Sequence, residues 1–354
     1  MWIENNIFKE DLDYIMGVNF VDWEKLNNKI VFVTGATGLI GYYLVSALIY
    51  RNTICSSNIQ VIALVRNTDK AKDMFSAQLK VEKNFKLVEG DLENIPDIEE
   101  SIDYIIHGAS VTCNKYFIKY PVETIKTSVI GTMNILELAK RNNIHGMVYL
   151  SSIEIYGVNK KDEKMDELYE CNIDTMEPRS CYSESKRMCE NLCSSFYSEY
   201  DIPVNVLRLT QTLGPGVKED DNRVFAQFLK SYFHHKDIIL YTPGKSCRSC
   251  LYIADAVTAI LTVMLCGKYN QAYNCANEST YGSIANMADL VANNIGDGRI
   301  KVLFKLKKSN ELKEYISENY INLDTGKIRA LGWRSTVNLE NIFRRTIKSN
   351  YKHN

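Results

Sequence analysis

A tyrosine and a lysine four residues apart can form a catalytic pair, because on a helix this spacing brings both side chains to one face. There the ammonium lowers the pKa of the phenol and favours its use as a base. The sequence contains four such pairs, Tyr156/Lys160, Tyr182/Lys186, Tyr232/Lys236 and Tyr241/Lys245. Glycine or proline interrupts the first and last pairs, and the third lies beyond the sixth predicted strand. Tyr182 and Lys186 are therefore the predicted catalytic pair.

Two further reactive side chains follow a predicted strand at 146–150. Ser152 and Glu154 lie just past its carboxyl end, the edge at which ligands bind in open α/β sheets. We predict that Ser152 hydrogen-bonds the reacting hydroxyl of a substrate beside Tyr182; the alternative is a serine that caps the next turn. Glu154 is interpreted either as a base in the cleft or as a carboxylate on a solvent-facing loop.

A glycine-rich loop predicts a cofactor. The apolar run 30–34 leads into Gly35, and two more glycines follow at a spacing of three before a helical stretch. Glycine lets the backbone approach a pyrophosphate, and the free N–H groups at the start of the helix attract it. A dinucleotide site is therefore predicted, with contacts from Gly35, Thr37, Gly38, Leu39, Ile40 and Gly41.

The end of the second predicted strand bears on the choice of dinucleotide. A cofactor without a 2′-phosphate usually meets Asp or Glu there, whereas this sequence has Arg66. A guanidinium accommodates a 2′-phosphate, so Arg66 tilts the prediction from NAD towards NADP; a solvated surface arginine is the alternative. Asp91 and Leu92 follow the third strand and are predicted near the adenine, although Asp91 could equally cap the next turn.

These residues need a scaffold of alternating strands and helices. Stretches with helical periodicity separate short β-branched runs, which lie at 30–34, 60–65, 86–89, 104–107, 146–150 and 203–209. The alternation predicts an α/β fold with a doubly wound, Rossmann-like parallel sheet. We divide the chain into a polar helical extension at 1–28 packed on the outside, a dinucleotide-binding domain at 29–213, and a smaller lobe at 214–354 that mainly binds the substrate.

The composition is that of an ordinary folded protein. Of 354 residues, 45% are hydrophobic and 24% charged, and the net charge of -1 indicates neither a nucleic-acid nor an anionic-membrane partner. The N-terminus lacks a secretion signal and no run is long enough to cross a membrane, which predicts a cytoplasmic protein. The ten cysteines are predicted to be reduced thiols, and no metal site is expected from Cys247, Cys250 or the five histidines.

The order of the glycine loop, Ser152, Tyr182 and Lys186 resembles the extended short-chain dehydrogenase/reductase family, in particular its nucleotide-sugar epimerases, dehydratases and decarboxylases. The likeness extends from about residue 30 to 351, with supporting strings at 90–92, 106–109, 131–137, 208–216 and 248–255. It implies a nucleotide-diphosphate sugar as substrate. It also implies cofactor contacts at Ala109, Tyr182 and Lys186. Arg223 and Arg248 would face the nucleotide diphosphate, and Gln211, a further substrate contact, stands where the family usually has Asn.

The resemblance implies a homodimer as well, in which two helices of each subunit form a four-helix bundle. The compatible apolar positions could equally belong to the core; they are Ile125, Val129, Met133, Leu136, Met188, Leu192 and Phe196.

The resemblance further implies a reaction. Tyr182, as a phenolate held by Lys186 and the positive nicotinamide ring, takes the proton of the sugar 4-hydroxyl while hydride passes to the cofactor. The 4-keto sugar is then epimerised at C4, dehydrated across C5 and C6, or decarboxylated at C6. Dehydratases of the family typically have an Asp-Glu pair where this chain has Ile153 and Glu154. Glu154 could thus serve as the base, but no acid stands at position 153 to protonate a leaving hydroxyl. This combination fits decarboxylation better, because loss of carbon dioxide needs no such acid.

The stretch 221–228 also resembles the UDP-glucuronate decarboxylases, although these normally carry an acidic residue in place of Arg66. The predicted function is a nucleotide-sugar-modifying enzyme, most similar to those decarboxylases, with a 4-epimerase, a 4,6-dehydratase or a reductase using free NADPH as alternatives. A dinucleotide-binding sensor without activity is a further alternative, which the set Ser152, Tyr182 and Lys186 disfavours.

Overall fold

A parallel sheet of seven strands forms the centre of the molecule in the computed structural model, which describes residues 6–112, 114–218, 220–307 and 318–350. From one edge to the other the strands are β12 (Ala272–Cys275), β7 (Val204–Leu209), β5 (Gly146–Ser152), β4 (Tyr104–His107), β1 (Ile30–Thr34), β2 (Gln60–Val65) and β3 (Phe85–Glu89). The chain runs outward from β1 to β3 and then returns to place β4 on the other side of β1. This reversal opens a ligand crevice at the carboxyl ends of β1 and β4.

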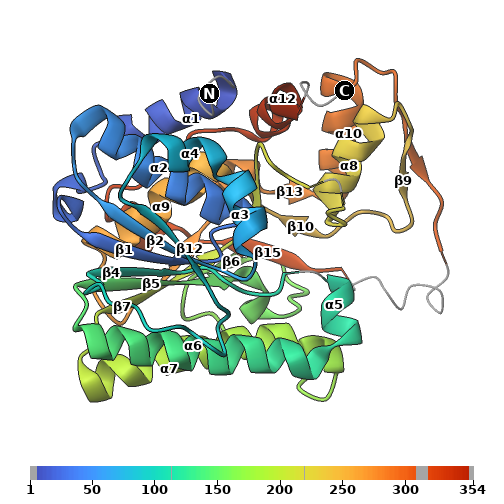
Figure 1. Ribbon diagram of the computed structural model, residues 1–354. Helices are drawn as coiled ribbons and strands as arrows, with labels where there is room; N and C mark the ends of the chain where they lie inside the picture. Colours follow the sequence, from blue (N-terminus) through green and yellow to red (C-terminus); the bar gives the residue numbers. More distant parts are fainter. Residues whose placement is uncertain (1–5, 113, 219, 308–317, 351–354) are drawn as a thin grey trace.

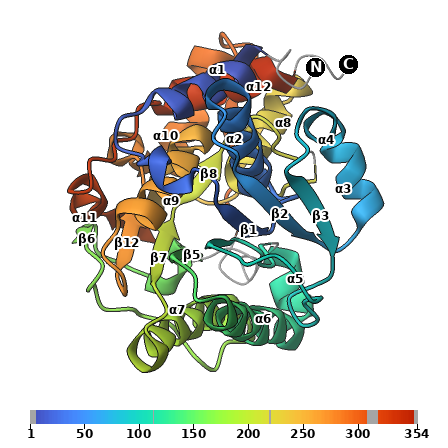
Figure 2. The ribbon, with the colours of Figure 1, turned by 60° about the vertical axis from the view of Figure 1, so that its left-hand side comes forward.

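Helices cover both faces of the sheet (Figures 1 and 2). The helices α6 (Pro121–Asn142) and α7 (Cys181–Tyr200) pack side by side on one face, and α2 (Leu39–Cys55) and α9 (Ile253–Cys266) pack on the other. Residues of β1 alternate between the two cores: Val31 and Val33 join the cluster of α2 and α9, whereas Phe32 joins that of α6 and α7. Burial on both faces explains why the strands read as continuous apolar runs.

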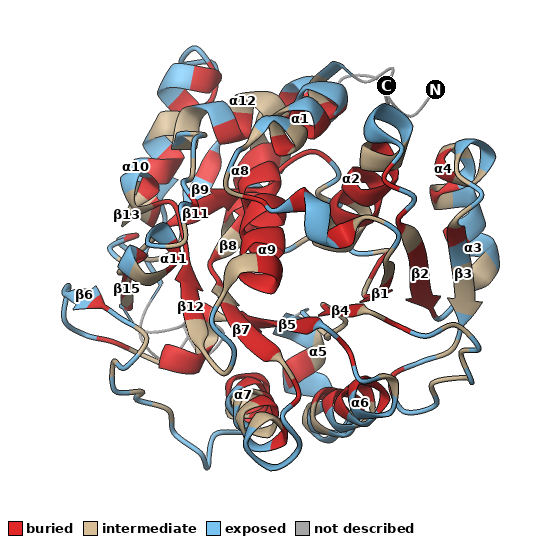
Figure 3. Cartoon of the chain, turned by 90° about the vertical axis from the view of Figure 1, so that its left-hand side faces the viewer, coloured by how far each residue is buried: buried red, intermediate tan, exposed pale blue. Residues whose placement is uncertain are grey.

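The predicted doubly wound α/β fold is therefore confirmed. Figure 3 shows the resulting gradient of burial, with α9 buried almost throughout and α6 and α7 exposed along their outer sides. Shorter helices at the rim are α3 (Thr68–Met74), α4 (Ser76–Val81) and α5 (Asn114–Lys119).

The smaller lobe beside the sheet contains the helices α8 (Val224–Phe233), α10 (Ile284–Asp289), α11 (Gly326–Arg329) and α12 (Leu339–Asn350). Its strands are β6 (Lys164–Met165), β8 (Gln211–Leu213), β9 (Ile238–Leu240), β10 (Cys247–Arg248), β11 (Cys250–Tyr252), β13 (Gly282–Ser283), β14 (Val302–Phe304) and β15 (Tyr320–Leu323). They form a sheet ordered β13-β10-β15-β6 and two pairs, β11-β8 and β14-β9. The helix α9 and strand β12 return from this part of the chain to the large sheet.

The N-terminal extension forms α1 (Asn6–Gly17), which lies over α2 at the periphery in Figure 1. Its inner face is part of the core, because Phe8, Leu12 and Ile15 are buried against α2, α9 and α12. The start of the predicted extension, residues 1–5, and the end of the predicted lobe, residues 351–354, lie outside the described residues.

Candidate functional site

The glycine loop lies between β1 and α2, at the crevice. Gly35 has a φ of +75°, and a Cβ there would lie 2.7 Å from the backbone nitrogen of Ala109. At Gly41 a Cβ would lie 2.2 Å from the carbonyl oxygen of Gly35. Gly38 is the N-cap of α2 and offers no side chain to the N–H groups of the first turn. This close backbone cradle fits the pyrophosphate of a dinucleotide.

A buried histidine on the strand next to β1 hydrogen-bonds the residue that precedes the glycine loop. His107 on β4 lies 2.8 Å from the hydroxyl of Thr34 through Nδ1 and 3.1 Å from that of Thr132 through Nε2. Burial lowers the pKa of His107 to about 3, so the ring is neutral and acts through hydrogen bonds. The Thr34 hydroxyl in turn accepts the N–H of Ala109, 3.1 Å away. This bond holds the backbone of Ala109, a predicted cofactor contact, beside Gly35.

The residues predicted around the adenosine lie at the ends of β2 and β3. Arg66 is exposed and has no hydrogen-bond or ion-pair partner within the described part of the chain. Asp91 accepts the N–H groups of Glu93 and Asn94 at 2.9 and 2.8 Å, so its carboxylate caps the turn, as one of its two interpretations required. Leu92 is buried. Their contacts with a cofactor remain predictions.

Tyr182 and Lys186 lie on the first two turns of α7, both almost wholly buried. The Tyr182 ring stacks on Phe117 of α5 at a centroid distance of 4.5 Å. Lys186 Nζ donates to the carbonyl of Leu150 at 2.7 Å and lies 5.9 Å from the centre of the Tyr182 ring. Burial lowers the pKa of Lys186 to about 8 and raises that of Tyr182 well above its usual value. The chain on its own therefore keeps the phenol protonated at neutral pH.

Ser152 and Glu154 begin the short helix η3 (Ile153–Tyr156), directly after β5. The Ser152 hydroxyl accepts the N–H of Glu154 at 3.2 Å. Its proximity to the Tyr182 hydroxyl partly offsets the rise that burial causes in the pKa of that phenol. The site thus brings Ser152, Glu154 and Tyr182 together, as the sequence predicts. Ile153 points away from them, since it is buried in a cluster with Tyr156 and Met165.

Arg179 is a site residue that the sequence analysis missed. It lies in η4 (Pro178–Ser180), and its Nη2 forms an ion pair with Glu154 Oε2 at 3.0 Å. Its Nε donates to Asn114 Oδ1 at 2.5 Å, and the guanidinium lies over the ring of Phe117 at 5.0 Å. The available signal was its position three residues before Tyr182, which places it in the turn that leads into α7.

The residues predicted to contact the substrate come from three segments. Within the described residues, the buried Oε1 of Gln211 on β8 and the buried Nε of Arg248 on β10 lack hydrogen-bond partners. Buried polar atoms are rarely left unpaired, so both are suited to a polar ligand. The guanidinium of Arg223 pairs with Asp221 at 2.6 Å and lies over the Phe225 ring at 4.5 Å.

These arginines belong to the same electrostatic environment as the predicted catalytic side chains. The charge of Arg223 favours the ionised form of Tyr182, as does that of Arg179, whereas that of Glu154 opposes it. Glu154 also acts on the charge of Arg248. The site is therefore rich in cations around one carboxylate, which suits an anionic substrate.

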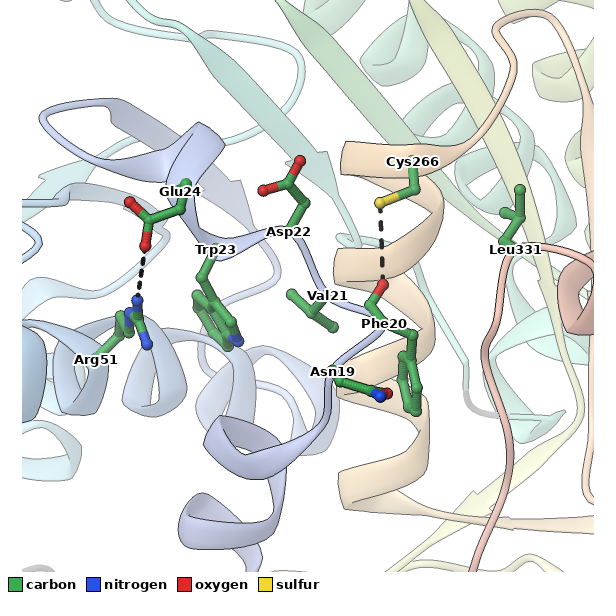
Figure 4. A pocket seen from close by; sticks show the side chains of 9 residues that line it. All are labelled: Asn19, Phe20, Val21, Asp22, Trp23, Glu24, Arg51, Cys266 and Leu331. Carbon is green, nitrogen blue, oxygen red and sulfur yellow. Dashed lines mark hydrogen bonds and ion pairs between the residues drawn. The ribbon is translucent and has the colours of Figure 1, made fainter.

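A separate cavity of about 520 Å³ lies by Trp23, Arg51 and Cys266 (Figure 4). Trp23 precedes β1, and Cys266 precedes β12, so this cavity is at the amino ends of the strands, away from Tyr182. The nine cysteines within the described ranges are free thiols, and no three His, Cys, Asp or Glu side chains gather there as a metal site. None of the helices that the structure describes could span a membrane.

The family model "NAD dependent epimerase/dehydratase family" matches residues 31–276. The chain is 26% identical to UDP-glucuronic acid decarboxylase 1 of Xenopus tropicalis over 321 residues, covering 91% of this chain and 72% of that protein. It is 31% identical to UDP-glucuronic acid decarboxylase 6 of Arabidopsis thaliana over 239 residues, covering 67% and 66%. For UDP-glucuronic acid decarboxylase 4 of the same plant, the match spans only 59% of the relative's length.

Solved structures share the fold at low sequence identity. One is a UDP-N-acetylglucosamine 4-epimerase from Methanobrevibacter ruminantium in complex with UDP-N-acetylmuramic acid, with a TM-score of 0.76 and 19% identity over 92% of this chain and 99% of that one. Another is a dTDP-glucose 4,6-dehydratase from Bacillus anthracis in complex with NAD, with a TM-score of 0.73 and 19% identity over 92% and 97%.

Proposed function

This chain belongs to the NAD-dependent epimerase/dehydratase family, and from that premise we propose that it decarboxylates UDP-glucuronate through transient oxidation at C4 of the sugar. The names of its curated relatives support this choice among the reactions of the family. So does the geometry, in which one carboxylate lies in the cation-rich site of Tyr182.

The observation that carries the proposal is the contrast between Glu154 and Ile153. Glu154 lies by Tyr182 and is held by Arg179, whereas Ile153 is 5% exposed and packed in an apolar cluster. No acid from position 153 can therefore protonate a leaving hydroxyl at C6, as 4,6-dehydration requires. Loss of carbon dioxide from a β-keto acid needs no such acid.

In the proposed reaction, Tyr182 removes the proton of the 4-hydroxyl while Ser152 hydrogen-bonds the same oxygen. A nicotinamide bound at the glycine loop would supply a positive charge that favours the phenolate, and the capacity to take up hydride from C4 and give it back. The resulting 4-keto acid breaks its C5–C6 bond, carbon dioxide leaves, and the electron pair forms an enolate that takes a proton at C5. Glu154 orients the sugar and assists this protonation, and Tyr182 returns its proton to the 4-oxygen as C4 is reduced.

The positive charge of Arg179 allows a second carboxylate, that of the substrate, to bind near Glu154. A substrate carboxylate beside Glu154 would meet like-charge repulsion, unless a cation lies between the two. Arg179 uses Nη2 for Glu154 and Nε for Asn114, while its Nη1 has no partner among the described residues. We assign Nη1 to the sugar carboxylate.

Mass spectrometry of purified protein incubated with UDP-glucuronate tests the proposal. A product lighter by carbon dioxide, with the mass of a UDP-pentose, is expected. Loss of water from UDP-glucose or dTDP-glucose would instead establish a dehydratase, and an unchanged mass with a new chromatographic peak would establish an epimerase. Either result in place of decarboxylation contradicts the proposal, and no product from any nucleotide sugar favours the sensor.

For the cofactor we propose that Arg66 allows NADP to bind in addition to NAD. The exposed, unpartnered guanidinium lies at the end of β2, where the adenosine ribose is expected. No carboxylate stands at this position to repel a 2′-phosphate.

We also propose a homodimer through the outer sides of α6 and α7. Ile125, Met133 and Met188 are between 39% and 50% exposed there, whereas Leu136 and Phe196 belong to the core. Exposed apolar side chains at helical spacing are typical of a helical interface. Light scattering after gel filtration should give twice the chain mass, and Met133→Glu should halve it.

The division into 1–28, 29–213 and 214–354 likewise remains a proposal about how the chain works. The last segment supplies most of the lobe as well as α9 and β12 of the large sheet, whereas β6 and β8 of the lobe come from the segment 29–213.

A further inference from the structure

The helix α1 precedes the part of the chain that the family model matches, yet it contacts both halves of the site. We propose that α1 fixes the distance between the cofactor-binding helix α2 and the strands that bind the nucleotide diphosphate, with Asp11 as the positioning residue. The inference rests on the proposed nucleotide-sugar site and adds to it a role for residues that the proposed reaction does not use.

Asp11 joins three elements through one buried carboxylate. Its Oδ2 accepts the hydroxyl of Tyr43 at 3.0 Å and that of Tyr252 at 2.8 Å, and its Oδ1 accepts Nη2 of Arg345 at 2.7 Å. Tyr43 belongs to α2, Tyr252 to β11 and Arg345 to α12. Because Arg345 also donates from Nε to the Tyr252 hydroxyl at 3.0 Å, the contacts form a closed network.

The elements that Asp11 joins lead directly to the two ligands. The helix α2 begins at the glycine loop, where the cofactor pyrophosphate is expected. The strand β11 follows Arg248 after one residue and pairs in parallel with β8, with Cys250 opposite Gln211. A displacement of Tyr252 would therefore move Gln211 and Arg248, two of the predicted substrate contacts.

Tyr14, one turn after Asp11 on α1, makes a second contact with the region that follows β11. The hydroxyl of Tyr14 donates to Oδ1 of Asp255, at the start of α9, over 2.8 Å. Oδ2 of Asp255 accepts the N–H groups of Thr336 and Val337 at 3.1 and 3.3 Å. The helix α1 is thus attached to the end of β11 and to the start of α9.

The network of Asp11 contributes more to the orientation of the residues that it joins than to the stability of the fold. Burial raises the pKa of Asp11, and the charge of Arg345 opposes that rise. A buried ion pair adds little net stability, because desolvation offsets most of the attraction between its charges. Its angular hydrogen bonds do define one arrangement of the groups that they join.

The same helix provides a matched control. Asp13 accepts the Tyr50 hydroxyl at 2.6 Å and Nζ of Lys9 at 2.5 Å, so its contacts join α1 to α2 only. Within the described residues, the hydrogen bonds of Asp13 stay on α1 and α2, whereas Asp11 reaches the substrate strands through Tyr252. Loss of either carboxylate weakens the packing of α1, but only loss of Asp11 releases β11.

The test measures the dissociation constant of UDP by calorimetry for the full-length wild type, Asp11→Asn and Asp13→Asn, together with thermal unfolding and the amount of bound cofactor. We expect Asp11→Asn to weaken UDP binding about tenfold, as loss of a charge-assisted contact would. Asp13→Asn should stay within about twofold. Any turnover by Asp11→Asn should show a raised KM with little change in kcat, because α1 packs mainly on α2, α9 and α12, whereas Tyr182 and Ser152 lie on α7 and β5.

Wild-type affinity for UDP in folded Asp11→Asn would overturn the inference, since a merely structural role lowers the unfolding temperature without changing the dissociation constant. If Asp11→Asn fails to fold, Tyr252→Phe removes only the hydroxyl of the network and must show the same loss. If the wild type prefers dTDP, GDP or CDP, the uridine assignment of the proposed function fails, and the same ratio measured with that nucleotide decides this inference. Binding of none of the four contradicts both.

Discussion

The cofactor side of the site and the sugar side are built in different ways. On the cofactor side, one contiguous segment supplies backbone, and the space at Gly35 and Gly41 is too small for a Cβ. On the sugar side, charged side chains come from η3, η4, α8 and β10, and they already engage one another, as Arg179 does Glu154 and Arg223 does Asp221.

This difference teaches where the reactions of one family can diverge. A backbone cradle binds a pyrophosphate whatever the neighbouring side chains are, so it stays the same while the chemistry changes. Ion pairs between side chains change with single substitutions, and the pair of Arg179 and Glu154 would be lost by a substitution of either residue. The comparison predicts that substitutions on the sugar side alter the reaction, and that those on the cofactor side alter which dinucleotide binds.

The largest effect is expected at Tyr182. Tyr182→Phe removes the hydroxyl that exchanges a proton with the sugar, and general acid-base catalysis of this kind contributes roughly 10²- to 10⁴-fold. Product formation should therefore fall by about 10³-fold, measured by mass spectrometry over time. The bound cofactor should be retained, because Tyr182 reacts on the sugar side; turnover close to that of the wild type would remove the catalytic assignment.

A smaller loss is expected at Arg179. Arg179→Gln leaves Glu154 without its cation, and the loss of a charged hydrogen bond corresponds to about 10- to 100-fold in kcat/KM for UDP-glucuronate. Arg187→Gln is the matched control, because Arg187 pairs with Glu184 at 3.1 Å on the exposed side of α7. Equal losses in both variants would show that Arg179 acts on the stability of the helix.

Lys186 lies between the cofactor side and the sugar side. At a pH where it is charged, its buried ammonium should lower the free energy of unfolding. Burial lowers the pKa of Lys186 from its ordinary value of 10.5 to about 8. Between these pH values the unfolded chain binds a proton that the folded chain does not, so the stability of the wild type rises with pH. Lys186→Met should thus be more stable than the wild type by about 1–3 kcal/mol at pH 7.

This advantage should shrink as the pH approaches 10.5, and the variant should be inactive at every pH. Urea unfolding of both proteins at pH 7 and pH 10 measures the difference. A variant that is less stable at pH 7 would show that the bond from Lys186 Nζ to the Leu150 carbonyl outweighs the cost of burying the charge.

The smallest effect is expected on the cofactor side. Arg66→Ala should reduce the preference for NADP over NAD by about tenfold, as expected for an exposed contact to one phosphate, and should leave kcat with NAD unchanged. Dissociation constants of both dinucleotides for protein stripped of cofactor measure this ratio. Lys70→Ala, another exposed cation of the same segment, shows whether the effect belongs to Arg66 alone.

The sequence by itself determined the strands, the glycine loop and the pair Tyr182/Lys186. Predicted strands at 30–34, 60–65 and 104–107 coincide with β1, β2 and β4, because strands buried on both faces are continuous apolar runs. The loop and the pair are local patterns, and their geometry follows from a few consecutive residues on one turn or one helix.

Only the tertiary structure decided what surrounds these patterns. It pairs Arg179 with Glu154 and packs the side chain of Ile153 in an apolar cluster. It also buries Asp11 between α2, β11 and α12. It also returned α9 and β12 to the large sheet. Each of these depends on residues far apart in the chain, where no local period or spacing carries the information and packing alone selects the partner.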